Sequence, residues 1–471
     1  MYKLSYYNFL IQDPYGQFYL LYNSLNNGLY EIGKEQFEVL KRFEKNETIS
    51  NDDINVLDDS FKTMLYEKCI IVEKSCDELS IVRVREEKIK KKINTKKSVT
   101  LTLVPTNSCN LNCLYCFEGE KRHKGVIKNE VINHLLNRLD KEIITNDCES
   151  LYVTWYGGEP TVGLKIIDKY TPLLINLAEQ RKIPYGSSMI TNGTLLNAEK
   201  WAILVKNKIT KVQITIDGDE LTHNILRPCI DKKKNSYKMI LNALQCLPSN
   251  IEVTLRVNCN KNVIDTIPRL LQDLDQYGIW PDKAKQVKIK LARIRYYPNS
   301  RGKKSDFLTE RDFYNFEMKF RYQLYQYAHD WAKRKGSKSP KLLFRYPALS
   351  SFICATTHYP NGFAMDQYGF LYKCWDYVND PKHRLHHINK PYREIFDNPQ
   401  CVNLLNYSKL CDNDCIACKF LPICNSDCPI ARLENRKQCC EWKYYLSDFL
   451  IQQYRMYLSN PVSMVLKQQV K

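Results

Sequence analysis

From residue 99 onward, short apolar runs that suit β-strands alternate with longer segments whose apolar residues recur at helical spacing. The strand-like runs occupy residues 99–105, 150–156, 185–191, 210–216, 251–258 and 286–294. The helical patterns between them occupy residues 128–145, 163–180, 197–206, 236–246 and 263–277. Six strands with intervening helices predict an α/β fold, a partial (βα)6 TIM-like barrel over residues 99–300. In such folds, ligands bind at the C-terminal ends of the strands.

The first 85 residues follow a different pattern. Strand-like runs at 18–22 and 29–32 flank the turn signal Asn26-Asn27-Gly28 and predict a β-hairpin. Two helices are expected next, one with Phe37, Leu40 and Phe43 on a single face and one from Ser50 to Leu65. Short strands are expected near residues 70–72 and 81–82. This order predicts a small α+β domain over residues 1–85.

The other segments of the chain are distinguished by their charge, by apolar residues at helical spacing or by their cysteines. Residues 86–98 are expected to be a solvated linker, because the stretch 83–97 holds eight basic and two acidic residues; a basic track for an acidic peptide is the alternative. Residues 301–350 are expected to be a helical connector whose apolar stripe packs in a core. A Cys-rich domain over residues 351–445 and a C-terminal helix over 446–471 complete the predicted organisation.

Composition narrows the class of protein. The chain has 471 residues, and neither its start nor any later stretch forms an apolar run long enough to span a membrane, so we expect a cytoplasmic protein without a membrane partner. Its 19 cysteines cluster at ligand spacings, which favours metal ligation over disulfides. The net charge of +18 is compatible with an AT-rich genome or with an acidic partner, and no nucleic-acid module signature accompanies it.

Three cysteines directly after the first strand are the strongest chemical signal. Cys109, Cys113 and Cys116 form a C-x3-C-x2-C pattern. A 4Fe-4S cluster is normally held by four thiolates, so this loop leaves one iron open to an external ligand. A zinc site or three unrelated buried cysteines are the alternatives.

At this loop the sequence resembles the radical S-adenosylmethionine (SAM) superfamily. The resemblance implies that SAM chelates the open iron, and Tyr115 fills the family's aromatic position before the third cysteine. The second strand ends in Gly157-Gly158-Glu159-Pro160, which matches the family motif that contacts the SAM amino group.

Polar residues at later strand ends resemble further family motifs for SAM or substrate. They are Thr191, Asn192, Thr215, Asp217, Arg227 and Arg256. Asp217 is a candidate catalytic residue, and Arg256 is expected to face into the barrel and pair with the SAM carboxylate. Ordinary turns at Asn192 and Asp217, and an interior salt bridge at Arg256, are the alternatives.

The C-terminal cysteines follow the pattern C-x14-G-x4-C from Cys354 to Cys374, then C-x2-C-x5-C-x3-C from Cys415 to Cys428, and then the pair Cys439-Cys440. In this pattern the sequence resembles the SPASM domain, an extension of many radical SAM enzymes that carries two auxiliary clusters. The resemblance assigns one cluster to Cys354, Cys374 and Cys428, and the other to Cys415, Cys418, Cys424 and either Cys440 or Cys439. The first cluster has no obvious fourth ligand, so Cys401, Cys411 or an open iron completes it. Zinc is the alternative metal for these C-terminal cysteines.

The resemblance implies a peptide or protein maturase with SAM and 4Fe-4S clusters as cofactors, one cluster binding SAM and two auxiliary. Reductive cleavage of SAM requires an electron donor such as flavodoxin or ferredoxin. Asp376, two residues after Cys374, is a candidate catalytic base or an ordinary surface carboxylate. The N-terminal domain resembles winged-helix domains that bind leader peptides, with a structural cap as the alternative.

Three functions remain open. The first is oxidative crosslinking of a ribosomally synthesised peptide. The second is an anaerobic sulfatase-maturating enzyme, which forms formylglycine. The third, of another class, is a non-catalytic, metal-stabilised peptide-binding protein.

Overall fold

The computed structural model describes residues 1–95, 97–116, 118, 125–145, 147–294, 307–338, 342–343, 347–350, 354, 356–425, 428–436, 439–459 and 464–465. The chain forms two compact units. The sheet unit comprises Thr95–Glu317 and Cys354–Asn406, and the terminal unit comprises Met1–Asn94, Met318–Ile353 and Tyr407–Lys471. Residues 351–445, which the sequence groups as one Cys-rich domain, therefore contribute to both units.

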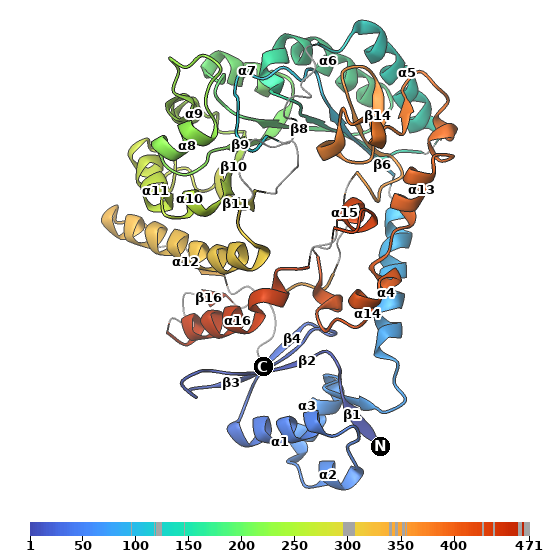
Figure 1. Cartoon of the computed structure of the whole chain (residues 1–471), viewed down its shortest axis with the longest axis vertical. Helices are drawn as coiled ribbons and strands as arrows, with labels where there is room; N and C mark the ends of the chain where they lie inside the picture. The colour runs from blue at the N-terminus through green and yellow to red at the C-terminus, as the bar shows by residue number, and fades with distance from the viewer. Residues whose placement is uncertain are drawn as a thin grey trace. The chain divides into compact units, whose positions relative to one another are not determined.

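The sheet unit contains the expected parallel array (Figure 1). Six parallel strands lie side by side in chain order: β6 (Ser98–Leu103), β7 (Ser150–Trp155), β8 (Tyr185–Thr191), β9 (Ile209–Thr215), β10 (Glu252–Cys259) and β11 (Val287–Arg293). Buried residues alternate along β7, where Leu151, Val153 and Trp155 face the core. The prediction of an α/β fold with six parallel strands is confirmed.

Three further strands extend this sheet beyond β6. Strand β13 (Gly362–Met365) pairs in parallel with β6, and β14 (Phe370–Tyr372) and β15 (His386–His387) follow in antiparallel pairing. The sheet therefore has nine strands in the order β11-β10-β9-β8-β7-β6-β13-β14-β15. The sequence did not predict that the Cys-rich segment would cover the edge of β6, because this pairing joins residues far apart in the chain.

Helices connect the strands of the sheet unit, and α5, α6 and α7 lie along one face of the sheet (Figure 1). The helices are α5 (Asn129–Thr145), α6 (Leu164–Gln180), α7 (Ala198–Lys206), α8 (Glu220–Leu226), α9 (Ser236–Gln245), α10 (Lys261–Ile264), α11 (Ile267–Gln276) and α13 (Pro399–Asn406). Helix α8 was not predicted. It begins at Asp219, whose side chain accepts a hydrogen bond from the backbone N–H of Thr222 at 3.0 Å.

The N-terminal part of the terminal unit contains the predicted hairpin. Strands β2 (Asn8–Gln12), β3 (Tyr19–Asn23) and β4 (Gly28–Ile32) form an antiparallel sheet, and β1 (Tyr2–Leu4) pairs with β5 (Ile71–Glu73). Helix α1 (Lys34–Lys45) buries the predicted face of Phe37, Leu40 and Phe43. This face and Leu21 of β3 belong to the same hydrophobic core.

The second expected helix is divided into two. Helix α2 (Asn51–Asn55) starts at Ser50 as predicted, and α3 (Asp59–Glu67) starts after it. The cause is Asp58, whose carboxylate accepts hydrogen bonds from the N–H groups of Ser60 and Phe61 and so begins a new helix.

One expectation for residues 81–94 is wrong. Residues 81–82 are not a strand, because they lie in helix α4 (Glu78–Asn94). The same helix contains most of the basic stretch, whose residues are largely exposed, so its role as a solvated linker stays a prediction. The buried Glu78 carboxylate accepts a hydrogen bond from the Tyr6 N–H at 3.0 Å, which fixes the first helical turn. Val82, one turn later, packs in an apolar cluster with Tyr7 and Leu25.

The C-terminal part of the terminal unit contains two short helices and a longer one. The short ones are α14 (Asn413–Ile416) and α15 (Pro429–Leu433), and the longer one is α16 (Trp442–Ser459). The predicted C-terminal helix thus begins earlier than residue 446, and Met464–Val465 form strand β16, which pairs with β12 (Leu342–Leu343), instead of continuing the helix. Helix α12 (Glu310–Arg334) contains the boundary between the units and buries Phe313 and Phe320 of the predicted stripe. Within the part of the chain that the structure describes, no helix is long and apolar enough to cross a membrane.

The Asp58 cap gives a testable prediction. Asp58→Ala should lower the free energy of opening α3 by about 1 kcal/mol, because two amides at its start lose their hydrogen-bond acceptor. Hydrogen exchange of the α3 amides in the native protein measures this opening. Asn55→Ala, on the exposed side of α2, is the control and should change it by less than about 0.5 kcal/mol. Equal exchange in both variants would contradict the cap.

Candidate functional site

The predicted site residues of the sheet unit lie where parallel strands end. The loop with Cys109, Cys113 and Cys116 follows β6, and the Gly157–Pro160 turn follows β7. Asn192 follows β8, and Asp217 follows β9. The carboxyl ends of parallel strands meet at one edge of a sheet, so these segments come together there.

The paired glycines admit the backbone of the cysteine loop. A Cβ atom at Gly157, which has φ +130°, would lie 2.5 Å from the carbonyl oxygen of Thr106, and one at Gly158 would lie 2.2 Å from that of Asn107. Two backbone hydrogen bonds join the segments, from Gly158 N to Thr106 O at 3.3 Å and from Glu159 N to Ser108 O at 2.9 Å. The paired glycines therefore let the residues before Cys109 approach the turn closely.

Glu159 joins three neighbouring segments. Its fully buried carboxylate accepts hydrogen bonds from Thr161 N at 2.9 Å, Thr191 Oγ1 at 2.6 Å and Asn192 N at 2.6 Å. Pro160 starts the short helix η2 (Pro160–Gly163) directly after it. The carboxylate therefore fixes the end of β8 relative to the turn after β7, while its contact with a SAM amino group stays a prediction.

Asn192 connects the end of β8 to the cysteine loop. Its Nδ2 donates to Asn110 Oδ1 at 2.9 Å and lies 3.9 Å from Cys109 Sγ. Thr194 Oγ1 donates to Asn192 Oδ1 at 2.7 Å and keeps the amide oriented. Thr215 is buried at the end of β9. These contacts exceed those of an ordinary turn at Asn192.

Tyr115 binds a group of polar side chains at the ends of β9 and β10. Its hydroxyl hydrogen-bonds Asp217 and accepts hydrogen bonds from Arg227 Nη1 at 2.7 Å and Asn258 Nδ2 at 3.0 Å. The other Asp217 oxygen accepts from Asn258 N at 2.8 Å. The sequence singled out Tyr115, Asp217 and Arg227 separately; their convergence on one phenol was not predicted.

Burial and neighbouring charges have opposite effects on the pKa values of Asp217 and Arg227. Burial raises the pKa of Asp217, although the Arg227 charge acts in the opposite direction. Burial disfavours the Arg227 cation, but Cys113, Tyr115 and Asp217 outweigh it and raise the pKa of Arg227 well above its usual range. Arg227 therefore stays positively charged beside Cys113.

The buried His223 side chain binds the backbone of Asp217. Its ring Nδ1 accepts a hydrogen bond from the Asp217 N–H at 3.0 Å, so the proton of the neutral ring lies on Nε2. Burial, together with the Arg227 charge, lowers the pKa of His223 well below its usual value. A neutral His223 therefore holds the backbone of Asp217 without adding a charge.

A second polar group surrounds Tyr156, the residue before the glycines. Burial raises the pKa of Tyr156 well above its usual value, and the charges of Glu118, Asp376 and Cys116 add to this effect, while Arg256 opposes it. Arg256 Nε also donates to Asn258 Oδ1 at 2.9 Å. Asp376 and Arg256, predicted from distant parts of the sequence, thus lie near one phenol. Tyr156 was not predicted as a site residue, and its only signal in the sequence is its place beside the glycines.

Lys373 is a buried residue that sequence reasoning missed. Its ammonium group donates to the carbonyl oxygens of Tyr359 at 2.6 Å and Gly362 at 2.9 Å, and lies 4.1 Å from the centre of the Phe363 ring. Burial lowers the pKa of Lys373 to about 7. Because Lys373 precedes Cys374, these bonds fix the backbone from which Cys374 extends.

The Cys-rich segment places its thiols in both units. In the sheet unit, Cys354 N donates to His358 Nδ1 at 3.0 Å, and Cys401 is fully buried near Lys373. Cys411 is exposed in the terminal unit, and Cys428 directly precedes the first residue of α15 there.

Cys440 lies with other predicted ligands of the terminal unit. A hydrogen bond with Cys424 raises the pKa of the buried Cys440, with burial and the Cys418 charge adding to the rise. Cys439 is only half-buried, and its sulfur lies 3.8 Å from Lys443 Nζ. This arrangement favours Cys440 over Cys439 as the ligand.

Thiol chemistry fits the implied clusters at these positions. Among the described residues, no three His, Cys, Asp or Glu side chains converge closely enough to hold a metal ion, so the ligand sets stay predictions from the sequence.

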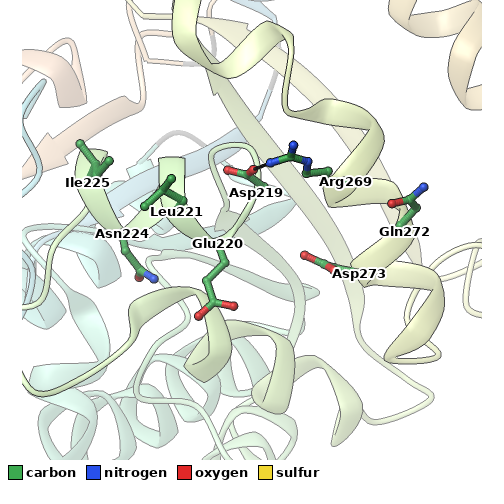
Figure 2. A pocket seen from close by; sticks show the side chains of 8 residues that line it. All are labelled: Asp219, Glu220, Leu221, Asn224, Ile225, Arg269, Gln272 and Asp273. Carbon is green, nitrogen blue, oxygen red and sulfur yellow. Dashed lines mark hydrogen bonds and ion pairs between the residues drawn. The ribbon is translucent and has the colours of Figure 1, made fainter.

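A separate groove of about 680 Å³ lies between α8 and α11. Figure 2 shows Asp219 paired with Arg269 across it, at 3.2 Å, beside the exposed side chains of Leu221 and Ile225. Of the residues that line it, none was a predicted site residue. We therefore assign the groove no part in the site.

The part of the chain that forms this site is similar in sequence to known proteins. The model of the radical SAM superfamily matches residues 103–274, which include the cysteine loop and the strand ends. The radical SAM cyclopropyl synthase TigE of Paramaledivibacter caminithermalis is 26% identical over 244 residues, which are 47% of this chain and 50% of TigE. This chain therefore spans about half the length of that relative.

Two other proteins match over a greater length. The cysteine-type anaerobic sulfatase-maturating enzyme of Clostridium novyi is 26% identical over 359 residues, which are 70% of this chain and 88% of that enzyme. The solved structure of native anSMEcpe with bound AdoMet and Cp18Cys peptide has a TM-score of 0.55 at 19% identity, covering 76% of this chain and 99% of that chain. The match to the solved structure shows a similarity of fold.

The glycine contact predicts the effect of one added methyl group. Gly158→Ala should displace the cysteine loop, because its Cβ would lie 2.2 Å from Asn107 O and 2.7 Å from Ser108 O. After anaerobic reconstitution, bound iron should fall by about four per chain, the content of one 4Fe-4S cluster.

Gly33→Ala is the matched control, because its Cβ would meet nothing nearer than 3.7 Å. Its iron content should equal that of the unmodified chain. A Gly158→Ala protein that retains all its iron would show that the loop tolerates the displacement.

Proposed function

Because residues 103–274 belong to the radical SAM superfamily, we propose that this chain is a maturase that oxidatively modifies a ribosomally synthesised peptide or protein, forming a crosslink. The observation that carries the proposal is the cysteine loop. Its backbone packs against the Gly157-Gly158 turn, and its Tyr115 binds polar groups at two further strand ends. This combination supports a cofactor site at the strand ends.

Cys109, Cys113 and Cys116 would hold three irons of a 4Fe-4S cluster and leave the fourth for SAM. When bound, the cluster and SAM supply reductive cleavage of SAM to methionine and a 5'-deoxyadenosyl radical that removes a hydrogen atom from the substrate. The chain's own residues hold the loop, exclude water and orient the reactants.

Several side chains would bind SAM. In the proposal, the Gly157–Pro160 turn receives the amino group, Arg256 the carboxylate, and Thr191, Asn192 and Thr215 the ribose or the substrate. Arg227 is committed to Tyr115 and Asp217, so its role is to keep a positive charge beside Cys113. Asp217, which accepts hydrogen bonds in the same group, positions Tyr115.

The oxidation must also dispose of an electron and a proton. Auxiliary clusters at the C-terminal cysteines would accept the electron, and the contact between Cys424 and Cys440 supports the second of them. Asp376 would accept the proton, because it is half-buried and close enough to Tyr156 for its charge to raise the pKa of that phenol. A protein electron donor would supply the electron for SAM cleavage.

The order of elements in the N-terminal domain favours a peptide substrate. Its β2–β4 sheet is followed by helices α1 to α3, the order expected of a leader-binding winged helix. We therefore propose that residues 1–85 bind a leader segment of the substrate.

Sulfatase maturation is the second candidate. The match to the Clostridium novyi enzyme, which covers 88% of its length, favours it. Incubation with a peptide from a sulfatase, monitored by mass spectrometry for conversion of cysteine to formylglycine, separates it from crosslinking. Crosslinking instead removes two hydrogen atoms from a precursor peptide.

The cofactor assignment is tested by anaerobic reconstitution. About twelve irons per chain are expected from three 4Fe-4S clusters, with release of 5'-deoxyadenosine on addition of reductant and SAM. Cys113→Ala should abolish the release, because it removes one of the three ligands of the SAM-binding cluster. Zinc without nucleoside release would overturn the enzyme assignment and leave a metal-stabilised binding protein.

Asp376 gives a separate prediction. Asp376→Asn should retain nucleoside release but lower the yield of modified peptide at least about a hundredfold, the lower end of the range for general-base catalysis. Asp397→Asn, an exposed carboxylate of the sheet unit, is the control and should leave the ratio of product to nucleoside unchanged. An unchanged ratio in Asp376→Asn would exclude this residue as the base.

A further inference from the structure

The N-terminal strands contact the C-x2-C segment of the second predicted auxiliary site, and both belong to the terminal unit. The Tyr6 hydroxyl donates to the carbonyl oxygen of Ala417 at 2.7 Å. The Ser24 hydroxyl donates to that of Lys419, also at 2.7 Å. These two carbonyls lie on either side of Cys418, so residues from the N-terminal domain fix the backbone around a predicted ligand.

The neighbouring cysteine is packed from the same side. Cys415 is buried in an apolar cluster with Tyr7, Leu25, Val82 and Leu421. The first three of these residues come from the hairpin region and α4. The walls around Cys415 are therefore built largely by residues 7–82.

Further contacts keep the two segments in register. The rings of Phe9 and Phe420 lie 4.9 Å apart, and Lys419 Nζ lies 3.7 Å from Glu44 of α1. Arg85 Nη2 donates to the carbonyl oxygen of Leu25 at 3.0 Å, which ties α4 to the turn after Ser24. A chain of contacts thus leads from α1 and α4 to Cys418.

The other two predicted ligands, Cys424 and Cys440, are held by residues outside the N-terminal domain. Cys440 hydrogen-bonds Cys424, and Ser350 Oγ donates to the carbonyl oxygen of Cys424 at 2.8 Å. One pair of cysteines is therefore positioned by the N-terminal domain, and the other pair by residues outside that domain.

We propose that the N-terminal domain is a structural part of the second auxiliary cluster site, with Tyr6 and Ser24 as positioning residues for Cys418. The inference rests on the proposed function, which supplies the cluster. It gives the domain a second role besides peptide binding, because any movement of its strands reaches a cluster ligand through two hydrogen bonds.

The test uses the full chain, reconstituted anaerobically, with the double variant Tyr6→Phe/Ser24→Ala. Release of iron to a chelator should become about thirtyfold faster for one third of the iron. Thirtyfold corresponds to about 2 kcal/mol, the usual net contribution of two hydrogen bonds at about 1 kcal/mol each. The electron paramagnetic resonance signal and midpoint potential of one cluster should shift. Cys440→Ala, which removes a ligand of the second auxiliary site, identifies the signal that belongs to it.

The matched control is Tyr66→Phe/Ser60→Ala, which removes one tyrosine hydroxyl and one serine hydroxyl from α3. It should leave the iron release rates and the signals unchanged. Leu25→Ala, which removes an apolar neighbour of Cys415, should shift the same signal as the double variant. Unchanged signals in both Tyr6→Phe/Ser24→Ala and Leu25→Ala would overturn the proposal, and so would equal disturbance of all clusters.

The unmodified chain separates this inference from the proposed function. If it binds only about four irons, or none, the auxiliary clusters of the proposed function fail irrespective of the variants. If it binds about twelve irons and releases 5'-deoxyadenosine, a negative result with the variants rejects the positioning role alone.

Discussion

The geometry of the strand ends depends on a contact between two backbones that leaves no room for a Cβ atom. At Gly157 and Gly158 the chain approaches the carbonyl oxygens of Thr106 and Asn107 directly, so the start of the cysteine loop is set by the packing of β6 against β7. Glu159, the next residue, carries the same constraint to β8 through Thr191 and Asn192. One steric requirement thereby positions three neighbouring strand ends.

Buried charge is stabilised in two ways in the sheet unit. Arg227 has a carboxylate and a phenol as neighbours, so its cation is compensated by opposite charge and hydrogen bonds. Lys373 instead donates to backbone carbonyl oxygens, and its ammonium faces the Phe363 ring. The first arrangement maintains a fixed positive charge, whereas burial lowers the pKa of Lys373 to about 7. The two cations are therefore not equivalent electrostatically.

Local patterns explain which features could be predicted from the sequence. The six parallel strands, α1 and the cysteine loop depend on residues within one element or one turn, and they were predicted. Helix α4 was missed because Glu78 and Val82 find their partners near residues 5–25, and the edge pairing of β13 with β6 was missed because it joins distant segments. Likewise, nothing near Tyr115 in the sequence indicates that Arg227 and Asn258 bind it.

The pairing of β6 with β13 also sets an order of events during synthesis. Roughly 260 residues separate the two strands, which a ribosome needs roughly 13 to 50 seconds to translate. Until then the edge of β6 has unpaired backbone groups, beside the loop that carries three thiols. Residues 6–25 likewise wait for residues 415–421 before their contacts form. The nascent chain therefore exposes the edge of β6 until residues 362–365 have been translated, and the contact surface of residues 6–25 until residue 421 has been translated.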